Sequence, residues 1–276
     1  MNKCKLSLFF GYIFLIFIAL SMLFPFFVMI KIALLPENDI SINSTTFINM
    51  NITFDNFIHV FRKIPITRYF LNSMFVALCT TIGQVIISAL AGYAFARLEF
   101  RYKESLFLII LITMMVPPQV NIVPLFFLMR ELHLINTFSA LILPGLFGGF
   151  GVFFMRQYFL SLPKDLEDAA KIDGCNLFQT FFKIALPLAL PAVVTLFVFT
   201  FVTTWNSFIW PLIVTNTESM RTLPVGLAIF KGSFREITLW GDLMACSVIC
   251  VIPVVLIFLL SKKYFLSDLL SGSVKE

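Results

Sequence analysis

Charged side chains are scarce in this sequence. Only 13% of its 276 residues are Asp, Glu, Lys or Arg, whereas a soluble domain carries roughly 25%. Hydrophobic residues make up 59% of the chain, and Phe alone occupies 35 positions. The mean hydropathy is +0.96. These values exclude an ordinary water-soluble domain and indicate a chain whose outer surface faces lipid.

The sequence also lacks the residues that most enzymes and metal sites need. It has two His far apart in the chain and five Cys without a Cys-x-x-Cys pair, so we predict no metal site. No nucleophile–base cluster is recognisable, so no catalytic residue is predicted. A Gly-x-x-x-x-Gly-Lys-Ser/Thr phosphate loop is missing, and no cofactor is expected on this chain. The net charge of +5 is not gathered into a basic tract, which argues against nucleic-acid binding.

Long apolar runs take the place of these features. A bilayer crossing needs about 20 apolar residues, and six runs approach or exceed that length: 6–30, 69–96, 106–128, 138–154, 186–214 and 243–260. Several contain proline, which membrane helices tolerate when their neighbours satisfy the freed carbonyl groups. The predicted fold class is an all-α membrane protein with six transmembrane helices packed as a bundle.

An even number of spans places both termini on the same side of the membrane. If that side is the cytoplasm, 12 of the 20 Lys and Arg residues lie inside. The positive-inside rule therefore favours cytoplasmic termini. An ion-coupled secondary transporter generally places ionisable residues within its spans. Here the spans are nearly free of them, with Asp242 only at a membrane edge, so that class is disfavoured.

The loop 156–183 carries the most specific pattern in the chain. Pro163 suits a first helical turn, and Asp165, Glu167 and Asp168 complement the positive end of a helix dipole. Gly174 supplies the left-handed conformation that ends many helices. One face of the predicted helix is formed at i, i+3, i+4 and i+7 by Leu166, Ala169, Ala170 and Asp173.

A second short helix is predicted directly after this turn. Asn176 can cap it, and Gln179 stands three residues later, as in a capping box. The two helices form a helix–turn–helix projection between two spans. Physical pattern alone leaves two interpretations open, a docking element for another protein or an amphipathic loop on the membrane surface.

The full pattern resembles the EAA loop of binding-protein-dependent ABC importers, typically Glu-Ala-Ala, three residues and Gly. Asp168-Ala169-Ala170 stands at the start of the motif and Gly174 at its end. Asp168 departs from the usual Glu, which keeps the charge and shortens its reach. Matching flanks are found at Leu162-Pro163-Lys164 and at Ile184-Ala185-Leu186-Pro187.

The resemblance extends along nearly the whole chain. Its further motifs are Leu71-Asn72-Ser73, Pro117-Pro118, Trp205-Asn206, Trp210-Pro211-Leu212 and Pro253. The ending Gly272-Ser273-Val274-Lys275 is similar to that of carbohydrate importer permeases, specifically the shorter permease of maltose and glycerol-3-phosphate systems. Glu276 and Asp268 replace glycines expected there. An importer for an amino acid, metal or phosphate stays open as an alternative.

The resemblance implies a type I ABC importer permease in a bacterial cytoplasmic membrane. The implied partners are a second permease subunit, two cytoplasmic ATPase subunits that bind the ATP, an extracytoplasmic solute-binding protein and membrane lipid. The implied solute is a sugar, an oligosaccharide or a glycerol-phosphate-like molecule. Motif position assigns the contact with the ATPase to Glu167, Asp168, Ala169, Ala170, Asp173 and Gly174.

Three regions are expected along the chain. Residues 1–68 hold the first span and an extracytoplasmic loop, residues 69–261 form the transmembrane core with the EAA loop at about 156–185, and residues 262–276 form a cytoplasmic tail. Polar side chains within spans usually face a cavity or the bundle interior. Candidates for the solute path are Gln84, Gln119, Asn121, Asn206 and Ser207. Packing against neighbouring helices is an equally open interpretation for each.

Overall fold

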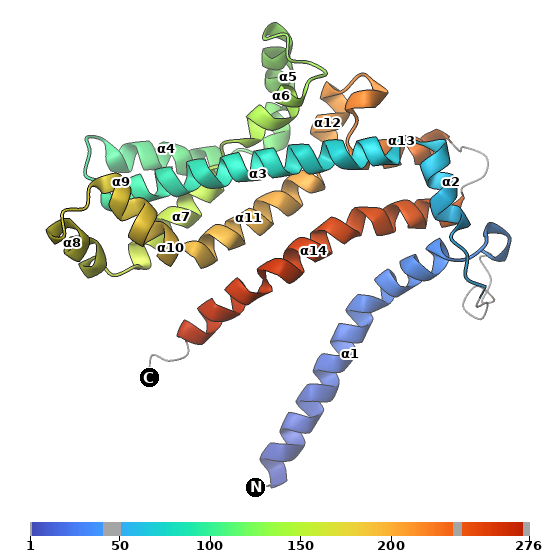
Figure 1. The fold of residues 1–276 in the computed structure, drawn as a ribbon, viewed down its shortest axis with the longest axis horizontal. Coiled ribbons are helices and arrows are strands. Elements are labelled where there is room, and N and C mark those ends of the chain that lie inside the picture. The colour runs from blue at the N-terminus through green and yellow to red at the C-terminus, as the bar shows by residue number, and fades with distance from the viewer. Residues whose placement is uncertain (1, 41–50, 234–238, 273–276) are drawn as a thin grey trace. The chain divides into compact units, whose positions relative to one another are not determined.

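The computed structural model describes residues 2–40, 51–233 and 239–272, and its regular elements there are all helical (Figure 1). The three long helices are α1 (Asn2–Ala33), α3 (Ile66–Arg97) and α14 (Trp240–Gly272). The shorter α-helices are α2 (Asp55–Lys63), α4 (Lys103–Met115), α5 (Ile122–Glu131), α6 (Phe138–Ile142), α7 (Gly149–Ser161), α8 (Asp165–Ile172), α9 (Leu177–Thr180), α10 (Leu186–Leu188), α11 (Leu190–Trp205), α12 (Ile209–Val214) and α13 (Leu223–Ser233).

The chain divides into two compact units. The first comprises Met1–Thr67 and Gly226–Pro253, and the second comprises Arg68–Val225 and Val254–Glu276. The first unit holds α1, α2 and the beginning of α14. The second holds nearly all of α3 and the helices from α4 to α12.

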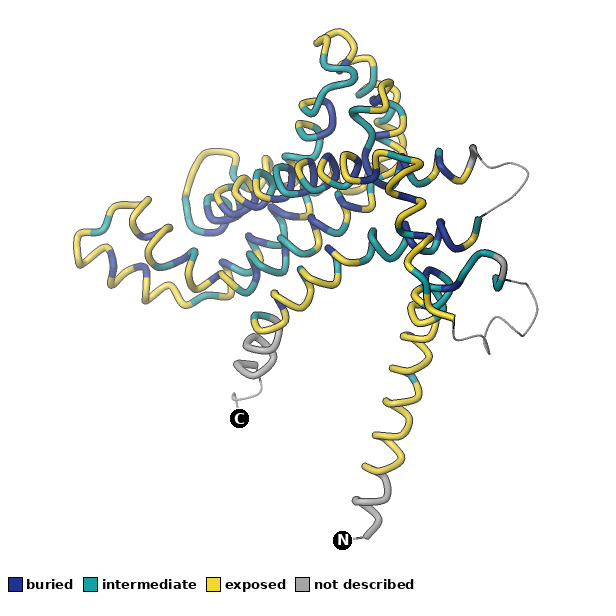
Figure 2. The backbone as a smooth tube through the Cα atoms, turned by 45° about the vertical axis from the view of Figure 1, so that its right-hand side comes forward, coloured by how far each residue is buried: buried dark blue, intermediate teal, exposed yellow. Residues whose placement is uncertain are grey.

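The six predicted spans correspond to two kinds of helical segment. Three helices are individually long and apolar enough to cross a membrane, and three further bent pairs bring the number to six if each pair is one span. The apolar surface of α1 stays exposed along most of its length, as Figure 2 shows, whereas α3 is partly buried. Exposed apolar helices of this length are the form expected in lipid.

The expected third span, 106–128, is sharply bent at the proline pair Pro117-Pro118. Lys103–Met115 and Pro118–Glu131 meet at an angle of 91°. Val116 between them is extended, with φ −85° and ψ 118°. The ring of Pro117 disfavours helical backbone at the residue before it, and neither proline has an N–H to donate. The two prolines therefore break the helix completely, although lipid-exposed segments usually favour continuous helix.

The expected fifth span, 186–214, also differs from the structure. Leu177–Leu188 and Leu190–Trp205 meet at 75° beside Pro191, and the helix then ends at Trp205. The segment to Val214 forms the separate helix α12. The fourth span bends by 41° within Phe138–Ser161, whereas α14 continues without a break through Pro253.

Glycines bring α3 and the region from α6 to α7 close together. Polar side chains of α3 occupy the space that a side chain would need: Thr80 at Gly145, Gln84 at Gly148 and Ser88 at Gly151. In the opposite direction, a Cβ on Gly92 of α3 would lie 2.8 Å from the backbone nitrogen of Arg156. Small residues allow this close backbone approach in membrane bundles.

An apolar cluster fills the second unit between α3, α7 and the segment leading to α11. Its centre is a group of three aromatic rings, in which the centroid of Tyr93 lies 5.4 Å from Phe159 and 5.0 Å from Phe181. Phe159 and Met155 have no exposed surface. This cluster supports the end of α3, next to which α8 and α9 lie (Figure 1).

Candidate functional site

The candidate site is the projection formed by α8 and α9 between α7 and α11. After Ser161 the chain becomes extended at Leu162, and α8 then begins at Asp165 with three acidic residues in its first turn. Gly174 has φ +81°. Its N–H donates to the carbonyl of Lys171 (3.0 Å), and the N–H of Cys175 donates to that of Ala170 (2.9 Å). This pair of bonds is a Schellman motif, and the predicted glycine stop is confirmed.

The predicted capping box at the start of α9 is also confirmed. The backbone N–H of Gln179 donates to Asn176 Oδ1, and the backbone N–H of Asn176 donates to Gln179 Oε1, both at 2.9 Å. These bonds satisfy two backbone donors that the first turn of a helix leaves free. The turn between α8 and α9 is thereby fixed on both sides by local sequence.

The inner face of α8 is fastened to the end of α3 by a buried ion pair. Arg97 Nε donates to Glu167 Oε1 at 2.7 Å, and the two side chains are only 5% and 9% exposed. Tyr93 donates its hydroxyl proton to Glu167 Oε2 at 3.1 Å. Arg97 Nη2 also donates to the carbonyl of Leu162, at 2.7 Å. Both carboxylate oxygens of Glu167 are thus satisfied within the chain.

This network changes how the predicted contact residues must be interpreted. Glu167 and Ala170 are buried against the rest of the chain, whereas Asp168, Ala169, Asp173 and Gly174 are exposed. The predicted single face of Leu166, Ala169, Ala170 and Asp173 is therefore divided, since only Ala170 points inward. Neither Arg97 nor Tyr93 was predicted as part of the site, because no local pattern links them to Glu167, which lies 70 and 74 residues further along the chain.

The outer face of α8 is exposed. Ile172 has 87% of its surface exposed, and Leu166 is exposed as well. Asp168, Ala169 and Asp173 share this exposed side of the helix. With most of its surface exposed, the Ile172 side chain is stabilised little by packing in the isolated chain. Burying such a side chain against a partner would stabilise the complex by about 1.5–3 kcal/mol.

Asp168 forms the second ion pair of α8, and this one is in water. Its Oδ1 accepts a hydrogen bond from Lys171 Nζ at 2.9 Å, with the two side chains 61% and 64% exposed. The hydrogen bond and the positive charge of Lys171 lower the pKa of the Asp168 carboxyl. Asp168 is therefore ionised on the outer face at neutral pH.

A further arginine joins three helix ends near the projection. Arg156 of α7 donates its Nε proton to the carbonyl of Phe95 in α3 (3.1 Å) and pairs with Glu104 of α4 (3.1 Å). Its guanidinium carbon lies 4.0 Å from the ring centroid of Phe107. The ends of α3, α4 and α7 are consequently held to one another where the projection leaves the bundle.

The five candidates for the solute path do not converge on one place. Gln84 is half-buried against Gly148, and Gln119 and Asn121 are exposed in the 3₁₀ turn at the bend between α4 and α5. The Asn206 side chain donates to the carbonyl of Val202 at the end of its own helix (2.9 Å).

Among these candidates, Ser207 lines a small cavity. The space is about 20 Å³, sufficient for one water molecule. The other lining residues are Ser73, Val76, Leu141, Thr204, Trp210, Pro211 and Thr222. The buried hydroxyl of Thr222 has no hydrogen-bond partner among the described residues, which makes this cavity suitable for a bound water.

The motif Asn72-Ser73 has a structural explanation. The Asn72 amide donates to the carbonyls of Ser219 and Arg221, both at 2.9 Å, and the Ser73 hydroxyl accepts from the N–H of Leu223 at 2.7 Å. The beginning of α3 therefore binds the backbone that leads into α13. This segment depends on side chains for its hydrogen bonds, because it is not within a long helix.

Comparison with known proteins gives concordant matches. A family model described as "Binding-protein-dependent transport system inner membrane component" matches residues 84–270. The arabinooligosaccharides transport system permease protein AraQ of Halalkalibacterium halodurans is 37% identical over 268 residues, which cover 96% of this chain and 94% of that protein. The sn-glycerol-3-phosphate transport system permease protein UgpE of Yersinia pestis is 31% identical over 269 residues, covering 95% and 96%.

A solved structure has the same fold. A chain of a bacterial ABC transporter involved in the import of the acidic polysaccharide alginate superposes with a TM-score of 0.82 at 23% identity. The superposition covers 96% of this chain and 98% of that one. The predicted fold class is confirmed by this similarity together with the helical spans described above.

Proposed function

Since this chain belongs to the family of binding-protein-dependent transport system inner membrane components, we propose that it is the shorter permease subunit of an ATP-driven carbohydrate importer. Family membership makes it a membrane permease component and not an enzyme. In the proposed assembly, a second permease completes the pathway and two ATPase subunits bind the ATP. A solute-binding protein delivers the solute.

The observation that carries this proposal is that α8 has two different faces. One face is held to α3 by a buried ion pair, and the other is exposed. Glu167 fixes the helix to α3, while Ile172, Asp168 and Ala169 face outward. A membrane-surface helix would need no buried ion pair to a span, since lipid would hold its apolar side. A docking helix needs both an exposed face and a buried attachment. A partner that binds the exposed face can move the bundle only if the opposite face is attached to a span.

We assign the contact with the ATPase to Asp168, Ala169, Asp173 and Gly174, and we add Ile172. Glu167 and Ala170 act behind this contact as positioning residues, because Glu167 is bonded to α3 and both side chains are buried within the chain. ATP-driven movement of the outer face then reaches α3 through Arg97. Such a device is a bistable element biased by nucleotide occupancy of the partner.

A carbohydrate is the solute class that the relatives favour. Their names specify arabinooligosaccharides and sn-glycerol 3-phosphate, and both matches cover nearly the whole chain. The path residues proposed for this chain stay Gln84, Gln119, Asn121, Asn206 and Ser207. Of these, Ser207 lines the water-sized cavity together with other hydroxyl-bearing side chains.

We further propose cytoplasmic termini in a bacterial inner membrane. The excess of Lys and Arg on that side supports this orientation. It places α8 on the cytoplasmic side, within reach of an ATPase. The division into 1–68, 69–261 and 262–276 is retained as a proposal, with residues 41–50, 234–238 and 273–276 outside the described part of the chain.

The decisive experiment changes the turn after α8 in the assembled importer. Proteoliposomes containing both permeases and the ATPase are given loaded binding protein, and ATP hydrolysis and solute uptake are measured. Gly174→Pro is incompatible with φ +81°, because proline fixes φ near −65°. Stimulated hydrolysis and uptake should be lost together. Gly174→Asn is the matched control, since Asn tolerates the left-handed conformation, and it should retain both activities.

Either of two outcomes would contradict the proposal. A correctly assembled Gly174→Pro complex that transports normally would remove α8 as the coupling element. For the solute class, uptake of arabino-oligosaccharide, maltodextrin and sn-glycerol 3-phosphate should be compared with uptake of methionine and phosphate. Transport of only the last two would exclude a carbohydrate importer while leaving the coupling result intact.

A further inference from the structure

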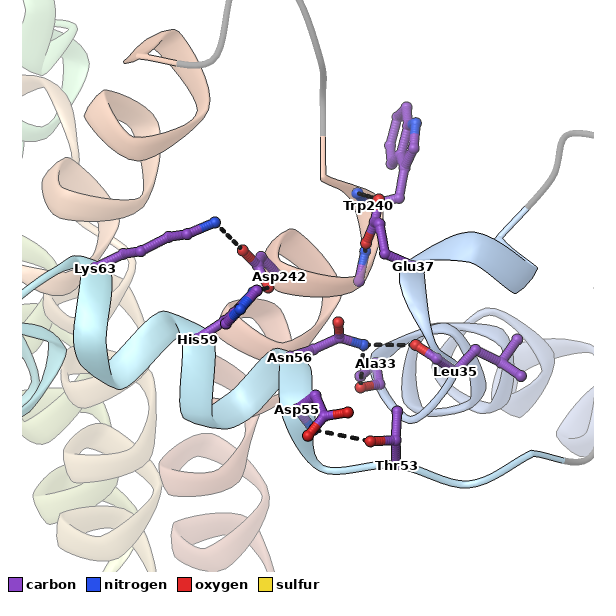
Figure 3. A network of polar contacts seen from close by, with 11 residues as sticks. Ala33, Leu35, Glu37, Thr53, Asp55, Asn56, His59, Lys63, Trp240 and Asp242 are labelled. Atoms are coloured by element: carbon purple, nitrogen blue, oxygen red, sulfur yellow. Dashed lines mark hydrogen bonds and ion pairs between the residues drawn. The ribbon is translucent and has the colours of Figure 1, made fainter.

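A polar network in the first unit fixes α2 at the place where membrane helices end. The Asn56 amide donates to the carbonyls of Ala33 (2.9 Å) and Leu35 (2.7 Å), where α1 ends. Lys63 Nζ lies 3.2 Å from the buried Asp242 carboxylate in the first turn of α14, as Figure 3 shows. Both ends of α2 are therefore attached to the ends of membrane helices.

The beginning of α14 is secured by a second contact in this network. Both carboxylate oxygens of Glu37 accept backbone hydrogen bonds, from Trp240 and from Gly241, each at 3.2 Å (Figure 3). In addition, α3 begins at Ile66, and only two residues separate it from the end of α2. Because α1 ends here and α3 and α14 begin here, α2 lies at the level of a membrane surface.

Three parallel rows of side chains run along α2 with the spacing i, i+4, i+7. The first row, Asn56, Val60 and Lys63, forms the attachment just described. The second row is exposed and polar, and it consists of Asp55, His59 and Arg62. Of these three, His59 also contacts the attachment, because its Nδ1 lies 3.8 Å from Asp242 Oδ1. The third row is exposed and apolar, and it consists of Phe54, Ile58 and Phe61. The exposed surface of α2 is thus amphipathic in its own right.

The apolar row requires a non-aqueous neighbour. Leaving Phe54, Ile58 and Phe61 in water forgoes about 1.5–3 kcal/mol for each side chain that could be buried. A helix with adjacent apolar and polar rows at a membrane boundary satisfies both by lying in the interface. Trp240, exposed in the same network, is a residue type enriched at that depth. The exposed apolar surface of α1, which ends at Ala33, continues the same lipid-facing environment.

We propose that α2 is an interfacial helix, with Phe54, Ile58 and Phe61 inserted at the headgroup–acyl boundary of the bilayer. Asp55 and Arg62 face water and the lipid headgroups, and the half-exposed His59 lies between that surface and Asp242. The inference goes beyond the proposed transport function, and it holds whichever side of the membrane α2 occupies. The network around Asn56 and Asp242 then makes α2 an attachment that keeps the ends of two membrane helices, α1 and α14, at the same depth.

Fluorescence quenching in the assembled importer tests this placement. Ile58→Trp and the matched control Arg62→Trp, one turn further along α2, are reconstituted in nanodiscs, and the emission of the parent protein is subtracted. Emission added at position 58 should be blue-shifted and quenched several-fold more by brominated phospholipid than emission at position 62. Aqueous iodide should give the opposite order.

Other occupants of the apolar row give different results. If position 58 is protected from both quenchers, a protein partner covers the row and the proposal is overturned. Strong iodide quenching that loaded binding protein removes would instead identify a docking surface for that protein, and it also overturns the proposal. Phe61→Trp repeats the measurement with an aromatic replacement, so failure of Ile58→Trp to assemble does not leave the question open.

Discussion

The two faces of α8 carry ion pairs of similar length in opposite surroundings. On the inner face, Arg97 and Glu167 lie 2.7 Å apart and are almost completely buried. On the outer face, Asp168 and Lys171 lie 2.9 Å apart with most of both side chains in water. Removing one partner of a buried pair leaves an uncompensated charge and costs about 3–5 kcal/mol. An exposed pair of this kind contributes little.

Glu167 and Asp168 are neighbours in the motif, but they have two different roles, attachment of α8 and contact with a partner. The distance between charged atoms does not distinguish the pairs, but burial does. Glu167 belongs to the machinery that holds α8 in place, whereas Asp168 is free to exchange Lys171 for a partner residue. Breaking each face separately should therefore give different phenotypes.

The largest effect is expected from Arg97→Met. The variant leaves the Glu167 carboxylate buried beside Tyr93 without its cation, and the attachment of α8 to α3 should weaken by about 3–5 kcal/mol. ATP hydrolysis stimulated by loaded binding protein should fall at least about tenfold relative to basal hydrolysis, since 1.36 kcal/mol corresponds to tenfold in rate. The measurement is the ratio of stimulated to basal hydrolysis in proteoliposomes.

A double variant serves as the control for this prediction. Arg97→Met combined with Glu167→Leu replaces the buried pair with apolar side chains, which is often neutral for stability. It should restore part of the stimulated hydrolysis. An unchanged ratio in the single variant would show that α8 does not transmit movement through α3.

Ile172→Asp should have the next largest effect, and only on the outer face. The side chain touches almost nothing in the isolated chain, so the thermal stability of the detergent-solubilised permease should not change. Loss of an apolar anchor should weaken binding of the ATPase by about 1.5–3 kcal/mol, which is at least tenfold in Kd. Titration of labelled ATPase onto permease-containing nanodiscs measures it. Lys164→Asp, which also introduces a carboxylate but places it before α8, is the control.

Asn176→Ala is expected to weaken the projection modestly. It removes the side-chain half of the capping box at the start of α9, and loss of such a cap costs about 1 kcal/mol. Hydrogen–deuterium exchange over residues 176–180 should increase, with coupling reduced less than in Arg97→Met. Asn176→Ser preserves a cap and should exchange as slowly as the parent. Equal exchange in Asn176→Ala would mean that neighbouring contacts alone fix α9.

The smallest effect is expected from Lys171→Gln. The pair with Asp168 is exposed, so the stability of the chain should be unchanged at neutral pH. Because Lys171 lowers the pKa of Asp168, the pair contributes only while that carboxyl is ionised. Its contribution is present above the ordinary pKa of Asp and is lost as the pH falls through the lowered value. NMR titration of Asp168 should show a higher pKa in Lys171→Gln, and an unchanged pKa would contradict the pairing.

Sequence patterns predicted those parts of the site whose hydrogen bonds join residues close together in the chain. The stop at Gly174 and the cap at Asn176 depend on neighbours within five residues, so a single sequence contains their cause. The partner of Glu167 lies 70 residues away at the end of a span and has no pattern that links the two. Burial of Ala170 and exposure of Ile172 follow from that distant contact, and for this reason the predicted face was divided.

The spans illustrate the same limit in a different way. Hydropathy located all six apolar segments, because lipid selects for length and apolar character. The pair Pro117-Pro118 indicated a bend, but not that the helix would turn by 91° and continue as α5. The size of such a turn depends on what the second half packs against. For α5 that neighbour includes Val214 of α12, which shares a buried apolar cluster with Met129 of α5.

The difference between α1 and the bent pairs has a consequence for the biosynthesis of this protein. The 26-residue apolar part of α1 is long enough to partition into the membrane without help from other segments. By contrast, α4 has 13 residues and is about 20 Å long, shorter than the hydrocarbon core of about 30 Å. The backbone groups at the C-terminal end of α4 are therefore shielded from lipid only after α5 has been made and α4 has packed against α3 and α7. A nascent chain should therefore integrate its first and second spans as they emerge from the ribosome, and its bent spans only when later helices are available.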